Sequence, residues 1–160
     1  MITDAAINIA PDVETQIGIV ENALPVARAL GVECPKVAVL SAVENVTDKM
    51  PSTVTAREIA ERGVEGCVIS GPLALDGAIS MESVKHKAIK DPVAGQADIL
   101  LVPFIEIGNV LYKACSYIAG KTMASTICGA SCPVVITSRA DTPDSKYYSI
   151  LMAVLRCLKA

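Results

Sequence analysis

The stretch Lys36–Leu40 (KVAVL), between Pro35 and Ser41, decides the fold of this chain. Its apolar residues are consecutive, without the polar alternation that marks a strand with one solvated face. Such a run is typical of a strand buried on both sides, and these strands occur mainly in parallel sheets covered by helices. The flanking sequence is therefore expected to supply helices on both sides of this strand.

An amphipathic helix is predicted before this strand, from Asp12 to Leu30. Asp12 is a suitable N-cap, and Gly31 is a suitable terminator. Pro25 lies inside the pattern, so the helix should kink there or end after its first half. The apolar residues at helical spacing are Val13, Ile17, Val20, Leu24 and Ala27.

The same alternation of apolar runs and helical patterns continues along the chain. Buried strands are predicted at 66–69 and 98–102, and shorter ones at 123–128 and 133–137. Helices are predicted from a Thr55–Glu58 capping box to Gly63, over 81–89, over 106–118, and from Thr142 and Pro143 onward. Strands that alternate with helices predict one α/β domain, of three-layer α/β/α architecture with a mostly parallel sheet.

Composition and charge limit the function classes. The 160 residues include 52% hydrophobic and only 3% aromatic side chains, and the net charge is -3. A single aliphatic core is expected, whereas a general attraction to nucleic acid is not. The uncharged window between Lys121 and Arg139 contains turn residues, and the N-terminus lacks a signal-peptide pattern, so a cytoplasmic protein is expected.

Metal and disulfide sites are not expected. The six cysteines are predicted to be free and buried as small apolar residues, because disulfides are uncommon in a reducing compartment. Only Cys128 and Cys132 are close in sequence, and His86 is the single histidine, so no tetrahedral ligand set is recognisable.

The last helix has an unusual distribution of side chains. Apolar residues cover more than half of its circumference. The polar residues that share the remaining arc are Lys146, Ser149, Arg156 and Lys159. Such a helix needs partners on more than one side, so part of its surface is expected to pack outside this chain, including in a homo-oligomer.

Polar residues follow several of the predicted strands. In open α/β sheets ligands bind at the carboxyl ends of the strands, so these residues are candidate ligand contacts. The same residue types cap helices and form turns, which leaves a structural role open for each. The candidates are Ser41, Glu44, Ser70, Gly71, Asp76, Glu106, Asn109, Ser138, Arg139 and Asp141.

Ser138 and Arg139 stand out among these candidates. They follow the last predicted strand, and Pro143 begins a helix whose free N–H groups favour an anion. Arginine is suited to bidentate contact with phosphate oxygens. The alternative, a loop salt bridge from Arg139 to Asp141, stays open from the spacing alone.

Motifs of several enzyme classes are absent from the sequence. There is no glycine-rich dinucleotide fingerprint, no phosphate-loop lysine motif, no nucleophile elbow and no pair of metal ligands. Nucleotide-dependent dehydrogenases, nucleoside triphosphatases and metallohydrolases are therefore disfavoured.

Six segments of the chain resemble the phosphate acetyl/butyryl transferase family, on its butyryl side. They are ITDAAINIAPD (2–12), PKVAVLSAVENVTDKMPST (35–53), SGPLALDGAIS (70–80), PVAGQADILLVP (92–103), IEIGNVLYK (105–113) and PVVITSRAD (133–141). The segments occur in the family's order across nearly the whole chain. They correspond only to the second half of the length of family members.

The resemblance implies an enzyme of two α/β/α domains, related in fold to isocitrate and isopropylmalate dehydrogenases, with the active site in the cleft between them. Residues 1–137 would form the second domain, and 138–160 an active-site loop and a helix that packs on the missing N-terminal domain. Such enzymes transfer an acetyl or butyryl group between coenzyme A and inorganic phosphate, with coenzyme A as a substrate and no cofactor. The chain alone is expected to be inactive, because one wall of the cleft is missing.

Residue roles follow from the same resemblance. Ser138 and Arg139 match the family's serine near the reacting centre and an arginine that holds phosphate. The aspartate that assists thiol deprotonation in the acetyl branch falls at Ser145, so Asp141 and Asp144 are the catalytic candidates here. The substrate and coenzyme A side of the cleft would be lined by Ser70, Gly71, Asp76, Glu106 and Asn109.

Two departures from the family pattern lie at the mouth of the cleft. Phe104 stands where the family usually has an acidic residue, and Ile107 where it has a small one. These side chains would narrow the site or shift the acyl preference, which keeps open a noncatalytic acyl-CoA or phosphate-binding module of the same fold. A decarboxylating dehydrogenase of this fold is disfavoured, because no matching cluster of metal-binding carboxylates is found.

Overall fold

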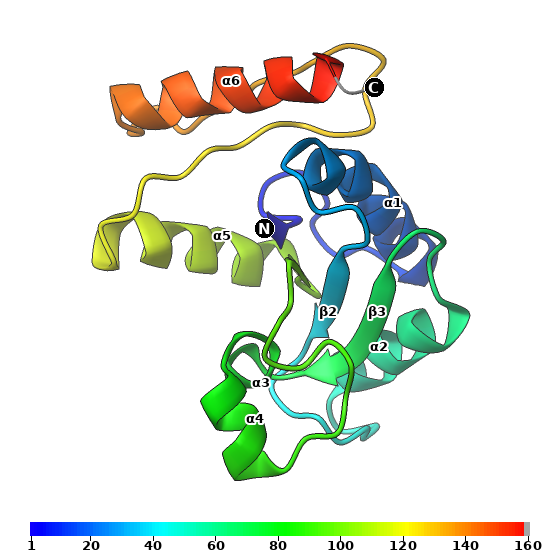
Figure 1. Ribbon diagram of the computed structural model, residues 1–160. Coiled ribbons are helices and arrows are strands. Elements are labelled where there is room, and N and C mark those ends of the chain that lie inside the picture. Colours follow the sequence, from blue (N-terminus) through cyan, green and yellow to red (C-terminus); the bar gives the residue numbers. More distant parts are fainter. Residues whose placement is uncertain (159–160) are drawn as a thin grey trace.

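The computed structural model describes residues 1–158. Within them, four parallel strands form one sheet in the order β1-β4-β2-β3. Figure 1 shows β2 and β3 side by side. The strands are β1 (Ile2–Thr3), β2 (Lys36–Leu40), β3 (Val68–Leu73) and β4 (Ile99–Leu101). The helices are α1 (Val13–Ala29), α2 (Pro51–Arg62), α3 (Leu75–Ile79), α4 (Met81–Lys87), α5 (Ile105–Lys113), the π-helical turn η1 (Ala114–Ile118) and α6 (Pro143–Leu158).

Two apolar cores lie on opposite faces of the sheet, and β2 contributes to both. Val37 and Val39 belong to the core beneath α1 and α2, together with the fully buried Ile59. Ala38 and Leu40 point the other way, into a second core that includes residues of α3. This alternation confirms the buried strand at 36–40 and the three-layer α/β/α prediction with a parallel sheet.

Helix α1 has the predicted ends and is not shortened at Pro25. The Asp12 carboxylate accepts a hydrogen bond of 2.9 Å from the Thr15 N–H and caps the helix. The helix then continues through Pro25 to Ala29, so the expectation of a helix shortened at Pro25 is wrong. The neighbours Leu24 and Val26 are both buried, and this packing holds the two halves together despite the missing N–H.

Helix α2 begins four residues before the predicted capping box. Pro51 occupies the first helical turn, where its missing N–H costs nothing. The buried Thr53 hydroxyl bonds to the Met50 and Thr47 carbonyls at 2.8 and 3.1 Å and accepts from the Thr47 N–H at 2.9 Å. These contacts fix the start of the helix and place Thr55 inside it, whereas the end at Gly63 is as predicted.

The two short strands predicted at 123–128 and 133–137 do not form. Within the described residues this region has a single antiparallel bridge, between Ile127 and Val134, and no strand of the sheet beside it. Its backbone is held by helix α6 instead, because the Ser125 N–H donates to the Ser149 hydroxyl at 2.9 Å. Ser138 therefore does not follow a strand of the sheet.

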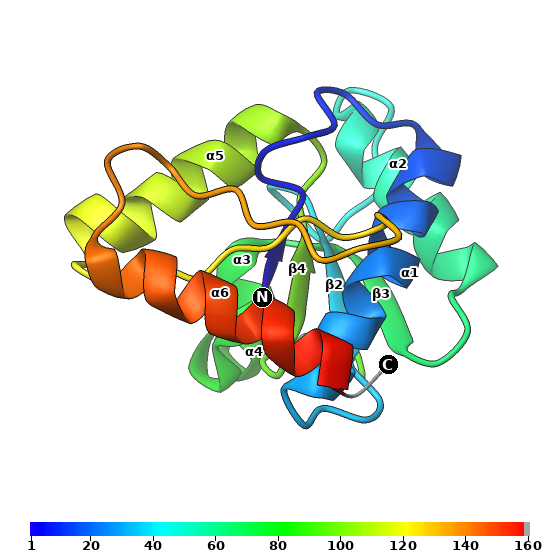
Figure 2. The ribbon, with the colours of Figure 1, turned by 90° about the horizontal axis from the view of Figure 1, so that it is seen from above.

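Helix α6 lies outside the sheet and its helices, and it runs from α5 across to α1 (Figures 1 and 2). Thr142 caps it as predicted, by accepting the Ser145 N–H at 3.2 Å. The inner face consists of the small residues Ser145, Ser149 and Ala153, all buried. The large exposed apolar residues of its other faces are Tyr147, Tyr148, Ile150, Leu151, Val154 and Leu158.

Two of the three buried residues of this helix are polar, and most of its large apolar residues are exposed, which is the reverse of a helix that packs on one core. Lys159, assigned to the polar arc from the sequence, lies outside the described residues. Among residues 1–158, no helix combines the length and apolar character that crossing a bilayer requires.

The cysteines differ from the prediction of buried apolar residues. Cys34, Cys132 and Cys157 are exposed, and the other three are only partly buried. All six are free, as expected. Cys67 packs against the first core without being fully buried, and the buried residues of both cores are aliphatic.

Candidate functional site

A small cavity of about 50 Å³ opens at the carboxyl ends of β2 and β4. The chain leaves β2 for β3 on one side and returns as β4 on the other, so this is the point where the strand order reverses. Ligands of open α/β sheets bind at such points. The cavity is lined by Pro11, Gln16, Val39, Leu40, Pro51, Ser52, Thr55, Pro103 and Phe104.

Ser70 and Gly71 have local structural partners on β3. The Ser70 hydroxyl donates to the carboxylate of Asp91, which also accepts the Val93 N–H at 2.8 Å. A Cβ at Gly71 would lie 2.8 Å from the Val39 Cβ and 2.9 Å from the Val39 carbonyl oxygen. Gly71 is therefore required by the close approach of β2 and β3, whatever it contributes to a ligand.

Asp76 and Glu44 are brought together by a lysine. The Lys87 ammonium lies 2.9 Å from the Asp76 carboxylate and 3.0 Å from that of Glu44. The hydrogen bond from Lys87 holds the pKa of the Asp76 carboxyl below its ordinary value. Lys87 thus offsets part of the negative charge of these two carboxylates, which would otherwise repel an anionic ligand.

The first turns of α5, directly after β4, carry Glu106 and Asn109. Glu106 is exposed and Asn109 half-buried, and their spacing places them on the same side of the helix. Phe104 and Ile107 lie beside them with exposed fractions of 42% and 45%. The start of α5 therefore combines two polar groups with an apolar rim.

The turn that contains Ser138 and Arg139 is fixed by Asp141. The Asp141 carboxylate accepts the Ser138 N–H at 2.7 Å, and the Asp141 N–H donates to the Ser138 carbonyl at 3.1 Å. The Tyr112 hydroxyl, on α5, donates to the same carboxylate at 2.9 Å. Asp141 is only 9% exposed, whereas the side chains of Ser138 and Arg139 are open to solvent.

The expected alternative for Arg139 is absent from the structure. Within residues 1–158, no ion pair joins its guanidinium to Asp141. Asp144 is exposed in the first turn of α6, and Ser145 is buried with its hydroxyl 3.4 Å from the Met123 N–H. Arg139 and Asp144 are therefore both accessible to a ligand, whereas the Asp141 carboxylate is hydrogen-bonded within the turn.

Tyr112 is the residue of this region that the sequence did not single out. Burial, followed by the hydrogen bond to Asp141, raises the pKa of Tyr112 to about 12. The phenol therefore remains a proton donor at neutral pH. Its only sequence signal is membership of the segment IEIGNVLYK (105–113), three residues after Asn109.

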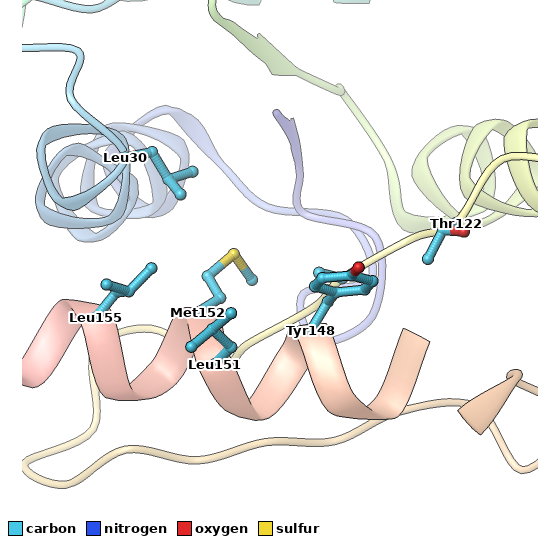
Figure 3. Close-up of a pocket in the computed structure, with 7 residues that line it drawn as sticks. Leu30, Thr122, Tyr148, Leu151, Met152 and Leu155 are labelled. Atoms are coloured by element: carbon cyan, nitrogen blue, oxygen red, sulfur yellow. The ribbon is translucent and has the colours of Figure 1, made fainter. Parts of the chain in front are cut away.

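A larger pocket, of about 420 Å³, lies under the second half of α6. Figure 3 shows Leu30, the residue after α1, facing Met152 and Leu155 of α6, with Thr122 across the opening. Its lining is mainly apolar and belongs to a different part of α6 from Asp144. The pocket marks incomplete packing between α6 and α1 rather than an extension of the polar site.

A parallel α/β domain with polar side chains at its strand ends and an exposed serine and arginine on an adjoining turn belongs to the open-sheet α/β proteins, which bind their ligands at the carboxyl ends of the strands. The sequence profile of the phosphate acetyl/butaryl transferase family matches residues 1–154, and the chain belongs to that family.

Curated relatives support this assignment. A probable phosphate butyryltransferase of Bacillus subtilis is 49% identical over 96% of this chain and 52% of its own length. A phosphate acetyltransferase of Thermotoga maritima is 45% identical over 97% of this chain and 54% of its own length. The phosphate butyryltransferase of Clostridium acetobutylicum is 47% identical over 96% of this chain and 52% of its own length. The chain thus spans about half the length of the curated relatives it matches.

Solved structures agree with the sequence comparison. A branched-chain phosphotransacylase from Enterococcus faecalis superposes with a TM-score of 0.93 at 45% identity, covering 99% of this chain and 58% of that one. A phosphotransacetylase from Streptococcus pyogenes gives a TM-score of 0.81 at 25% identity, covering 99% and 49%.

Proposed function

We propose that this chain supplies the C-terminal half of a phosphate acyltransferase, which moves an acetyl or butyryl group between coenzyme A and inorganic phosphate. The observation that carries the proposal is the turn at Ser138 and Arg139. It presents a hydroxyl and a guanidinium to solvent and is tied to α5, the helix that carries Glu106 and Asn109. The names of the relatives support the acyl and phosphate substrates.

In the proposed reaction, the thiol of coenzyme A loses its proton and the thiolate attacks the carbonyl carbon of an acyl phosphate. A C–S bond forms, the C–O bond to phosphate breaks, and phosphate leaves with the electron pair. Arg139 would hold two phosphate oxygens and offset their growing charge. Ser138 would donate a hydrogen bond at the reacting centre.

Asp144 is the better candidate for receiving the thiol proton. Asp141 already accepts hydrogen bonds from Tyr112 and the Ser138 N–H, whereas Asp144 is exposed. An ordinary aspartate has a pKa near 3.9 and a thiol one near 8.5, so Asp144 would need a less polar environment in the complete site. Closure of the cleft over α6 would provide it.

The other wall of the cleft is proposed to be the N-terminal half found in the relatives. Its contact surface on this chain would be residues 138–160, including the outer face of α6. Ile150 and Val154 on that face are 57% and 47% exposed, and burying the exposed half of such a side chain contributes about 1 kcal/mol. The exposure of this surface supports the proposal that the site is incomplete in the chain alone.

The first prediction concerns turnover. The protein to be tested is a chimera, in which the N-terminal half of the Clostridium acetobutylicum relative is joined to Met1 of this chain; it is termed the full-length form. In this protein we expect phosphate-dependent release of the coenzyme A thiol from butyryl-CoA. Hydroxylamine should trap the butyryl phosphate formed. The relative itself is the control, and an active control beside an inactive full-length form would contradict the proposal.

A second candidate function is a noncatalytic acyl-CoA or phosphate-binding module. The exposed Phe104 and Ile107 at the start of α5 favour it, since they would obstruct the site. Calorimetry distinguishes the two. Binding of coenzyme A to the full-length form without turnover would support the binding module, whereas turnover would exclude it.

A further inference from the structure

The Asp141 carboxylate accepts more hydrogen bonds from the protein than is expected of a general base that must receive a proton from a substrate. Both of its oxygens lie 2.9 Å from the Tyr112 hydroxyl, and Oδ2 also accepts the Ser138 N–H at 2.7 Å. The carboxylate is nearly buried. Since its lone pairs are directed at two donors within the protein, the role of Asp141 is to hold those donors.

These contacts join segments that are distant in sequence. Tyr112 lies near the end of α5, and Asp141 immediately precedes α6, which begins over that end of α5 (Figures 1 and 2). The Asp141 N–H also bonds to the Ser138 carbonyl, so the turn 138–141 is closed on itself and fastened to α5 by one phenol. Asn109 lies one helical turn before Tyr112 on the same helix.

We propose that Tyr112 and Asp141 are positioning residues for acyl transfer, which fasten the 138–141 turn to α5 so that Ser138 and Arg139 face the same phosphate as Asn109. This inference rests on the proposed function and adds two residues to it. Neither residue touches the reacting atoms. Tyr112 remains a donor because it is protonated at neutral pH.

The contact itself is tested in the 160-residue chain by amide hydrogen exchange followed by NMR. Tyr112→Phe removes one hydroxyl and leaves the ring, so the Ser138 amide should exchange about 10-fold faster while amides of β2 stay unchanged. Tyr117→Phe is the matched control, because Tyr117 is 61% exposed and should leave the Ser138 amide unaffected. Equal exchange in the two variants would overturn the contact.

The catalytic consequence is tested in the full-length form. Tyr112→Phe and Asp141→Asn should each raise the KM for phosphate about 10-fold and lower kcat, with the KM for butyryl-CoA within about twofold. The double variant should be no worse than the more damaging single one, because both act through one contact. A general loss of stability would instead lower the unfolding temperature and, through a smaller folded fraction, the apparent kcat, without a rise confined to the KM for phosphate.

The outcomes separate the two proposals. Wild-type turnover with unaltered phosphate kinetics in Tyr112→Phe would overturn the positioning role and leave the proposed function standing. A wild-type full-length form without turnover would overturn the proposed function, and the positioning role with it. A rise in the KM for phosphate alone, absent from Tyr117→Phe, is the result that the geometry predicts.

Discussion

Replacing Arg139 with alanine is expected to lower kcat/KM for butyryl phosphate, in the direction of butyryl-CoA formation, about 10²- to 10³-fold in the full-length form, which corresponds to about 3–4 kcal/mol of transition-state binding. The guanidinium is exposed, carries no ion pair within residues 1–158, and lies on a turn that holds its backbone in place. Charge on the leaving phosphate grows during the reaction, so loss of a bidentate donor affects the transition state more than the ground state.

Two variants make this prediction specific. Arg139→Lys keeps the charge but not the two parallel donors, and should recover only part of the activity. Arg57→Ala removes an exposed arginine on α2 and is the control, with activity expected to be unchanged. If Arg139→Ala loses no more activity than Arg57→Ala, Arg139 does not bind the phosphate.

Replacing Gly71 with alanine is expected to lower the free energy of unfolding by about 3 kcal/mol. The added Cβ would lie 2.8 Å from the Val39 Cβ and 2.9 Å from the Val39 carbonyl oxygen, so β2 and β3 would have to separate. Val39 is itself buried, and it is therefore unable to move away without disturbing the core. Urea denaturation of the 160-residue chain, followed by far-UV circular dichroism, measures the effect.

Gly18→Ala is the matched control for this substitution. A Cβ at Gly18, inside α1, meets no atom within 4 Å. Alanine is favoured over glycine in a helix by about 0.8–1 kcal/mol, so this variant should be slightly more stable than the wild type. Equal stability of the two variants would show that the strands have more room at Gly71 than the structure indicates.

The parts of the fold that could be predicted are those set by local sequence. The unbroken apolar run Val37–Leu40 was sufficient to place β2, and Asp12 and Gly31 bounded α1 correctly. The strands predicted at 123–128 and 133–137 do not form. An apolar stretch between turns has the same sequence pattern whether or not a neighbouring strand is available to pair with it. The backbone of this region is held by serines of α6, which no periodicity reveals.

The candidate site was only partly predictable from position in the fold. Ser138 and Arg139 were proposed to follow a strand at 133–137 that does not form, and the structure leaves both exposed on the turn at 138–141 instead. Tyr112 was missed because its partner Asp141 is 29 residues away, and no local spacing connects a phenol to a carboxylate across that separation. The resemblance left Asp141 and Asp144 as the catalytic candidates, whereas the contacts of Asp141 favour a positioning role.

The central claim, that this chain carries half of an acyltransferase site, is tested most directly by phosphate-dependent thiol release from butyryl-CoA. The 160-residue chain and the full-length form are compared at equal concentration. We predict turnover in the full-length form, and at least about 10³-fold less in the chain alone, because groups held by the other wall of the cleft are missing. Equal turnover by the chain alone would contradict the claim.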